Sequence, residues 1–113
     1  MSAQADFSAI KSQLSTTTAE GKAPYLAQEI FTGSTNNELK PAAFTSNGDV
    51  LGFSYAMGLK TQFTNGTLNN LAGIGSWSLD ATSDQTAAMV TNHDLERDAT
   101  TLRWLDGSRR AGR

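Results

Sequence analysis

The sequence has no cysteine, little positive charge and no long apolar run. Without cysteine it can form neither a disulfide framework nor a thiolate metal site. No apolar stretch approaches the roughly 20 residues that cross a bilayer, so no membrane partner is expected. Residues 1–6 also lack the basic and apolar regions of a signal peptide.

The excess charge is negative, with 9 Lys and Arg against 11 Asp and Glu, a net charge of −2 and a pI near 5.2. This balance argues against nucleic acid as the main partner. Every arginine lies at Arg97 or beyond, which suggests a basic tail. Short Gly/Ser/Arg termini are more often solvated ends than nucleic-acid arms.

The chain has 113 residues, of which 38% are hydrophobic and 8% aromatic. This is globular composition, and the length suits one small domain, 1–113, or a piece of a larger one.

Apolar spacing predicts helices and strands in alternation. Phe7, Ile10 and Leu14 predict a helix over 5–14. Short apolar runs predict strands over 24–31, 50–53 and 86–91. Alternation of this kind is typical of an α/β chain with parallel strands.

The residues Asn47-Gly48-Asp49 predict a turn before the second strand. Tyr55, Leu59 and Phe63 give the following helix an apolar stripe. That helix is expected to end at Asn65-Gly66. One or two further helical turns are expected over 67–74, and a final helix after Asp94. That final helix would include Leu102 and Trp104. The aromatic residues expected in the core are Tyr25, Phe53, Tyr55 and Phe63.

Acidic side chains close two of the predicted strands. Glu29 lies near the end of the first, and the third runs into Asn92, His93 and Asp94. Active sites in parallel α/β folds collect at the carboxyl ends of strands. A carboxyl pair suits glycoside hydrolysis, in which one group donates a proton and another stays ionised. An isolated Glu and a His-Asp pair also occur as ordinary surface groups.

Three segments resemble motifs of the α-amylases of glycoside hydrolase family 13. PYLAQEI over 24–30 resembles their fifth strand, SNGDVLGFSY over 46–55 the entry to their sixth strand, and VTNHDLER over 90–97 their seventh. The segments 5–14 and 67–77 are similar to the intervening amylase helices and loop. The resemblance covers nearly the whole chain in collinear order.

The resemblance implies a role for each matched residue. Glu29 matches the general acid/base, Asp94 the aspartate that binds sugar hydroxyls and stabilises the transition state, and His93 a histidine that hydrogen-bonds the same sugar. Asn92 matches a chloride ligand of the chloride-dependent branch. The other chloride ligands and most calcium ligands have no counterpart, so no metal site is assigned.

The chain departs from the family pattern at the catalytic nucleophile, an aspartate that ends the fourth strand and would precede the helix over 5–14. Asp6 or Asp98 could take its place. The first three strands and the eighth strand also lack counterparts, and Gly52 stands where many relatives carry an acidic residue. A full (β/α)8 barrel takes about 250 residues. The expected fold is therefore a partial (β/α)8 TIM-barrel segment with about three parallel strands, rearranged, self-associated or part of a longer product.

Two main functions stay open. The first is retaining endo-hydrolysis of α-1,4-glucosidic bonds in starch and related glucans, with an incomplete active site. The second is a catalytically inactive truncated barrel segment that forms a homo-oligomer or binds glucan. A designed or selected fragment is a third hypothesis. The resemblance implies an α-glucan partner and an extracellular location.

Overall fold

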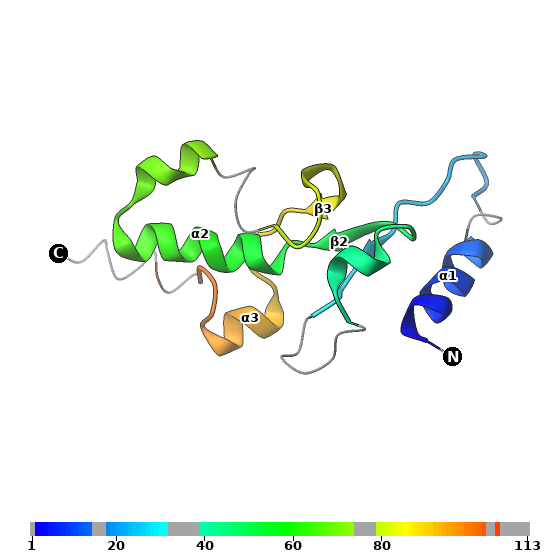
Figure 1. Ribbon diagram of the computed structural model, residues 1–113, viewed down its shortest axis with the longest axis horizontal. Helices are drawn as coiled ribbons and strands as arrows, with labels where there is room; N and C mark the ends of the chain where they lie inside the picture. The colour runs from blue at the N-terminus through cyan, green and yellow to red at the C-terminus, as the bar shows by residue number, and fades with distance from the viewer. Residues whose placement is uncertain (1, 15–17, 32–38, 74–78, 104–105, 107–113) are drawn as a thin grey trace. The chain divides into compact units, whose positions relative to one another are not determined.

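The computed structural model describes residues 2–14, 18–31, 39–73, 79–103 and 106 (Figure 1). The chain divides into two compact units, each described here by itself. Unit 1 comprises 1–51 and 80–87, and unit 2 comprises 52–79 and 88–113. No helix among the described residues is long and apolar enough to cross a membrane.

Unit 1 contains a three-stranded parallel sheet in the order β1-β2-β3. The strands are β1 (Ala27–Gln28), β2 (Asp49–Leu51) and β3 (Thr86–Ala87), and Figure 1 shows β2 beside β3. Gln28 pairs with Val50, and Val50 pairs with Thr86. The structure therefore confirms an α/β chain with parallel strands, without showing a barrel.

The strands are shorter than the sequence predicts. The first was expected over 24–31 and the third over 86–91, but only two residues of each join the ladder. Pro24 has no N–H to donate, and the residues that flank the paired ones belong to no strand. Tyr25 is 72% exposed, so its assignment to the core was wrong.

Helix α1 (Ala3–Leu14) packs one aromatic residue onto the unit 1 core. The Phe7 ring meets Phe44 edge to face, with 5.4 Å between centroids. The predicted apolar stripe is only partly covered, because Ile10 and Leu14 remain exposed. The core itself is formed by Ile30, Phe44 and Val50, with Ala3, Phe7, Leu39 and Ala81 packed around it.

A short 3₁₀ helix, η1 (Pro41–Phe44), precedes the predicted turn into β2. Its Pro41 and Phe44 are buried. At the turn, a Cβ added to Gly48 would lie 2.4 Å from the Leu26 carbonyl oxygen. Only glycine therefore allows the turn to approach the segment before β1 this closely. A second short 3₁₀ helix, η3 (Ser83–Gln85), leads into β3.

In unit 2, α2 (Phe53–Asn65) buries Phe53, Ala56 and Leu59. Tyr55 and Phe63, expected on the buried stripe, are only partly covered, because the inward face is set by the i, i+3, i+6 positions from Phe53. The 3₁₀ helix η2 (Leu68–Gly73) supplies the extra turns expected after Asn65-Gly66.

The last helix, α3 (His93–Asp98), begins earlier and ends earlier than predicted. It starts at His93 because Asn92 caps it, and it ends where Ala99 adopts a left-handed φ of 58°. Leu102 lies beyond the helix, and Trp104 falls outside the described residues. Leu95 is the buried residue of α3.

A first prediction contrasts neighbouring positions of opposite burial. Gln28 is 1% exposed and donates through Nε2 to the Phe44 and Gly48 carbonyl oxygens, at 3.0 Å each. Gln28→Glu places a carboxylate against these acceptors and should lower the free energy of unfolding by about 3 kcal/mol or more at neutral pH. The loss should shrink as the pH falls, because protonation removes the buried charge.

Glu29→Gln, the reverse exchange at the adjacent exposed position, is the matched control. It should change the free energy of unfolding by no more than about 0.5 kcal/mol. Urea unfolding followed by circular dichroism measures both variants. Equal stability of the two would contradict the burial pattern of β1.

A second prediction concerns the two left-handed helix ends of unit 2. Gly66 ends α2 at a φ of 69°, and Ala99 ends α3 at 58°. Gly66→Ala should destabilise the protein by about 1 kcal/mol, and Ala99→Gly should stabilise it by up to about 1 kcal/mol. Thermal unfolding midpoints report both changes, and shifts of the same sign in both variants would refute the expectation.

Candidate functional site

Glu29 follows β1 directly and points to solvent. Its neighbours Gln28 and Ile30 are 1% and 5% exposed, whereas Glu29 is exposed. Successive side chains of an extended segment face opposite sides, so burial of the neighbours turns Glu29 outward. Glu29 thereby avoids the cost of burying a carboxylate in an apolar strand, and it lies at the carboxyl end of a parallel strand, where catalytic groups are expected.

The buried Gln28 amide was missed by the sequence reasoning, although it stands beside Glu29. Its Nε2 bonds tie β1 to the end of η1 and to the turn before β2. Its Oε1 is buried and accepts no hydrogen bond from the described residues. A glutamine within an apolar run was the available signal, because such a residue must find buried partners.

Asn92, His93 and Asp94 lie together at the start of α3. Asn92 Oδ1 accepts a hydrogen bond from the Leu95 N–H at 2.9 Å, which satisfies one of the free donors of the first turn. His93 is largely exposed, with 81% of its side chain accessible, and its Nε2 lies 3.5 Å from Asp94 Oδ2. The Asn-His-Asp sequence thus serves locally as a helix start that presents an imidazole and a carboxylate to solvent.

Arg97 forms an ion pair with Asp94 that the sequence reasoning did not identify. The pair joins Arg97 Nη2 to Asp94 Oδ1, one helical turn apart. The i, i+3 spacing was the available signal. With 72% and 47% of the two side chains exposed, such a pair contributes only about 0–1 kcal/mol. It orients the carboxylate while leaving it accessible.

The predicted partners fall in different units, since Glu29 belongs to unit 1 and Asn92, His93 and Asp94 to unit 2. The convergence of Glu29 and Asp94 on one sugar therefore stays a prediction. The two candidate replacements for the nucleophile also belong to different units, with Asp6 exposed on α1 and Asp98 exposed at the end of α3.

The described side chains give little support for a calcium or a chloride site. No group of three or more His, Asp or Glu that could hold a metal occurs within the described ranges. Asn92 Oδ1 accepts the capping hydrogen bond, and a chloride ion, as an anion, would contact only the donor Nδ2 of that side chain. We therefore derive no chemical step through calcium or chloride.

A half-buried ionic cluster lies elsewhere in unit 2. Asp106 Oδ2 accepts from the Arg103 backbone N–H at 3.0 Å, and Asp106 Oδ1 lies 3.3 Å from Arg103 Nη2. Lys60 Nζ lies 4.0 Å from Asp106. The backbone hydrogen bond from Arg103, followed by its guanidinium and the neighbouring ammonium, lowers the pKa of Asp106.

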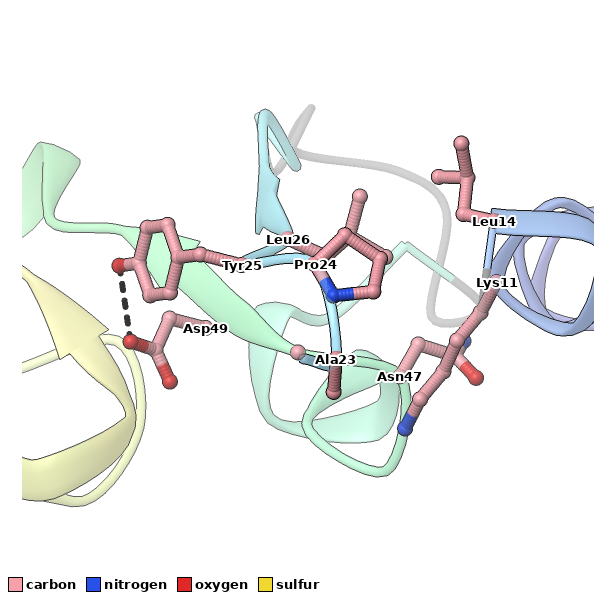
Figure 2. Close-up of a pocket in the computed structure, with 9 residues that line it drawn as sticks. Lys11, Leu14, Ala23, Pro24, Tyr25, Leu26, Asn47 and Asp49 are labelled. Carbon is pink, nitrogen blue, oxygen red and sulfur yellow. Dashed lines mark hydrogen bonds between the residues drawn. The ribbon is translucent and has the colours of Figure 1, made fainter. Parts of the chain in front are cut away.

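Unit 1 also contains a cavity of about 270 Å³ (Figure 2). Its wall comes from α1, from the segment that enters β1 and from the turn into β2, with lining residues Lys11, Leu14, Ala23, Pro24, Tyr25, Leu26, Asn47, Gly48 and Asp49. The Tyr25 hydroxyl donates to Asp49 Oδ2 at 2.8 Å. The sequence analysis did not identify this cavity, because its lining comes from three separate segments.

The comparisons with known proteins agree with part of the resemblance. Fold and side chains define an α/β chain with a parallel sheet and acidic groups after two of its strands. The sequence is 33% identical over 89 residues to an α-amylase of Thermomonospora curvata. The match covers 79% of this chain and 14% of that protein, so the chain spans about one seventh of its relative. This similarity supports an amylase-like relationship.

No protein-family model matches the sequence. No solved structure matches the chain either.

A third prediction concerns Tyr25. The hydrogen bond to Asp49, together with the carboxylate charge, raises the pKa of Tyr25. Asp49→Asn should bring that pKa back toward the ordinary value, because the amide carries no charge. Tyr55→Phe removes the other tyrosine, so the absorbance of tyrosinate then reports Tyr25 alone.

The sign of the linkage follows from the raised pKa. Any stability from the Tyr25–Asp49 bond is present below the ordinary tyrosine pKa and is lost as the pH rises through the raised value. Asp6→Asn, which changes a distant exposed acid, is the control and should leave the titration unchanged. An unchanged Tyr25 pKa in Asp49→Asn would refute Asp49 as the cause of the raised value.

Proposed function

We propose that this chain is a segment of the catalytic (β/α)8 barrel of an α-amylase-like glycoside hydrolase that acts on α-1,4-glucans. The observation that carries the proposal is the 33% identity to an α-amylase over 79% of the chain. The QE motif at Gln28-Glu29 and the Asn-His-Asp motif at 92–94 add to it, since the first closes β1 and the second follows β3.

The strand arrangement supports a barrel segment. In a βα barrel, consecutive parallel strands are neighbours and the catalytic groups follow their carboxyl ends. Strands β1, β2 and β3 are adjacent in chain order and parallel. Glu29 follows β1 at once, and Asp94 follows β3 after a short connection.

In this mechanism, Glu29 donates a proton to the glycosidic oxygen as the bond to the leaving sugar breaks. A carboxylate from outside the matched motifs attacks the anomeric carbon and forms the covalent glycosyl intermediate. Glu29 then takes a proton from a water molecule whose oxygen attacks the anomeric carbon. The bond between that carbon and the carboxylate breaks, and the sugar leaves with its configuration retained.

Asp94 and His93 hold the reacting sugar. Asp94 accepts hydrogen bonds from sugar hydroxyls, and the His93 imidazole donates to the same ring. The Asp94–Arg97 pair is exposed and weak, so hydroxyl groups can replace part of it at small cost. The proposed partners are α-glucan chains and a second copy of this chain, and the proposed location is extracellular.

The test of this function replaces the matched 89-residue region of the Thermomonospora curvata α-amylase with this chain. Glu29→Gln in that chimera should lower starch hydrolysis by about 10²–10⁴-fold, because an amide cannot transfer the proton. Glu20→Gln removes another exposed carboxylate, the one paired with Lys22, and should leave the rate unchanged. Undiminished hydrolysis after Glu29→Gln would remove Glu29 from the mechanism.

Experiments on the isolated chain, without the chimera, distinguish the two functional hypotheses. Maltoheptaose titration should show binding that Asp94→Asn and His93→Ala weaken, with starch hydrolysis strongly reduced or absent because no nucleophile is matched. Sizing chromatography accompanies the titration. Self-association without turnover in either the chain or the chimera would favour the inactive, oligomeric segment.

A further inference from the structure

The cavity of unit 1 lies at the opposite end of the sheet from Glu29. Residues 23–26 enter β1 and residues 47–49 enter β2, so the cavity is at the amino-terminal ends of these strands. Glu29 follows the carboxyl end of β1. The cavity is therefore separate from the proposed catalytic group, and an occupant would not compete directly for Glu29.

The cavity wall is mainly apolar. Leu14, Ala23, Pro24 and Leu26 provide carbon surface, and the Tyr25 ring stands at one side (Figure 2). An enclosed apolar cavity of about 150 Å³ accommodates benzene. The volume of about 270 Å³ therefore has room for one ring with a short side chain.

The positive charge of Lys11 at the cavity rim favours a ligand whose polar end is negatively charged. Lys11 Nζ donates to the Ser46 carbonyl oxygen at 2.7 Å, a neutral acceptor that uses one of its three protons. No carboxylate of the described residues lies within ion-pair distance of this ammonium, whereas Lys22 and Lys60 each have one. The Lys11 charge is thus uncompensated beside an apolar wall.

The carboxylate that lines the cavity, Asp49, already accepts a hydrogen bond from within the protein. Asp49 Oδ2 accepts from the Tyr25 hydroxyl, which holds that carboxylate against the ring. Figure 2 shows this pair on one side of the cavity and Lys11 with Leu14 on the other. An anion at Lys11 therefore sits away from the Asp49 charge.

We propose that the cavity between α1 and the entries to β1 and β2 binds a small organic acid with an apolar body. The carboxylate of the acid pairs with Lys11, and its ring or chain lies against Leu14, Pro24 and Leu26. Association involves no covalent step. The site does not include Glu29, the proposed acid/base, or His93 and Asp94, the proposed sugar-binding residues.

The probe is 3-phenylpropionate, titrated into the isotopically labelled chain and followed by amide NMR shifts. Saturable shifts should concentrate at the cavity residues in α1, 23–26 and 47–49. The neutral analogue 3-phenylpropan-1-ol has a similar body without the charge and should bind about fivefold more weakly. Added salt should narrow that difference, because it screens the exposed Lys11 charge.

Two variants and a matched control locate the contacts. Lys11→Met retains an unbranched side chain without charge and should weaken binding of the acid about fivefold, while leaving the alcohol unaffected. Ala23→Phe places a ring at the cavity wall and should weaken both ligands. Lys22→Met removes an exposed lysine outside the cavity and should change neither.

The outcomes are decisive in either direction. Saturable shifts at the cavity, with the acid preferred and the preference lost in Lys11→Met, support the site. Absence of saturation, shifts centred elsewhere, or equal binding of acid and alcohol overturns it. Failure here does not affect the chimera assay, since neither Glu29 nor the control residue Glu20 lines the cavity.

Discussion

The buried amide of Gln28 is the interaction on which the described part of the sheet depends. Its two hydrogen bonds hold the Phe44 carbonyl at the end of η1 and the Gly48 carbonyl at the turn into β2. Gly48 lies against the Leu26 backbone at a distance that excludes any side chain. These contacts flank the pairing of β1 with β2, in which Ala27 lies opposite Asp49 and Gln28 opposite Val50.

The same constraint orients the group proposed for catalysis. Because Gln28 and Ile30 are directed inward, Glu29 must face solvent at the carboxyl end of β1. Asp94 is exposed for another reason, since it lies in the first turn of α3 and pairs with Arg97 across one turn. Both acids are thus available to a substrate, one through strand alternation and one through a capped helix.

Apolar spacing predicted α1 and α2, and the alternation of elements predicted the parallel strands, whereas the predicted last helix extended beyond the end of α3 at Asp98. The spacing of Phe7, Ile10 and Leu14 marked α1, and Asn65-Gly66 marked the end of α2. Strand lengths were overestimated, because an apolar run does not reveal how many of its residues find a partner strand. Tyr25 was assigned to the core for its aromatic ring, but its hydroxyl bonds to Asp49 at an open cavity.

The sequence by itself determined the α/β order, the glycine turn at Gly48 and the motifs that point to an amylase-like relationship. These depend on local spacing and on residue chemistry, which can be read directly along the chain. Tertiary structure decided that Gln28 is buried, that Glu29 is exposed and that three separate segments enclose a cavity beside Lys11. Burial and enclosure are collective properties of segments distant in sequence, so no local pattern specifies them.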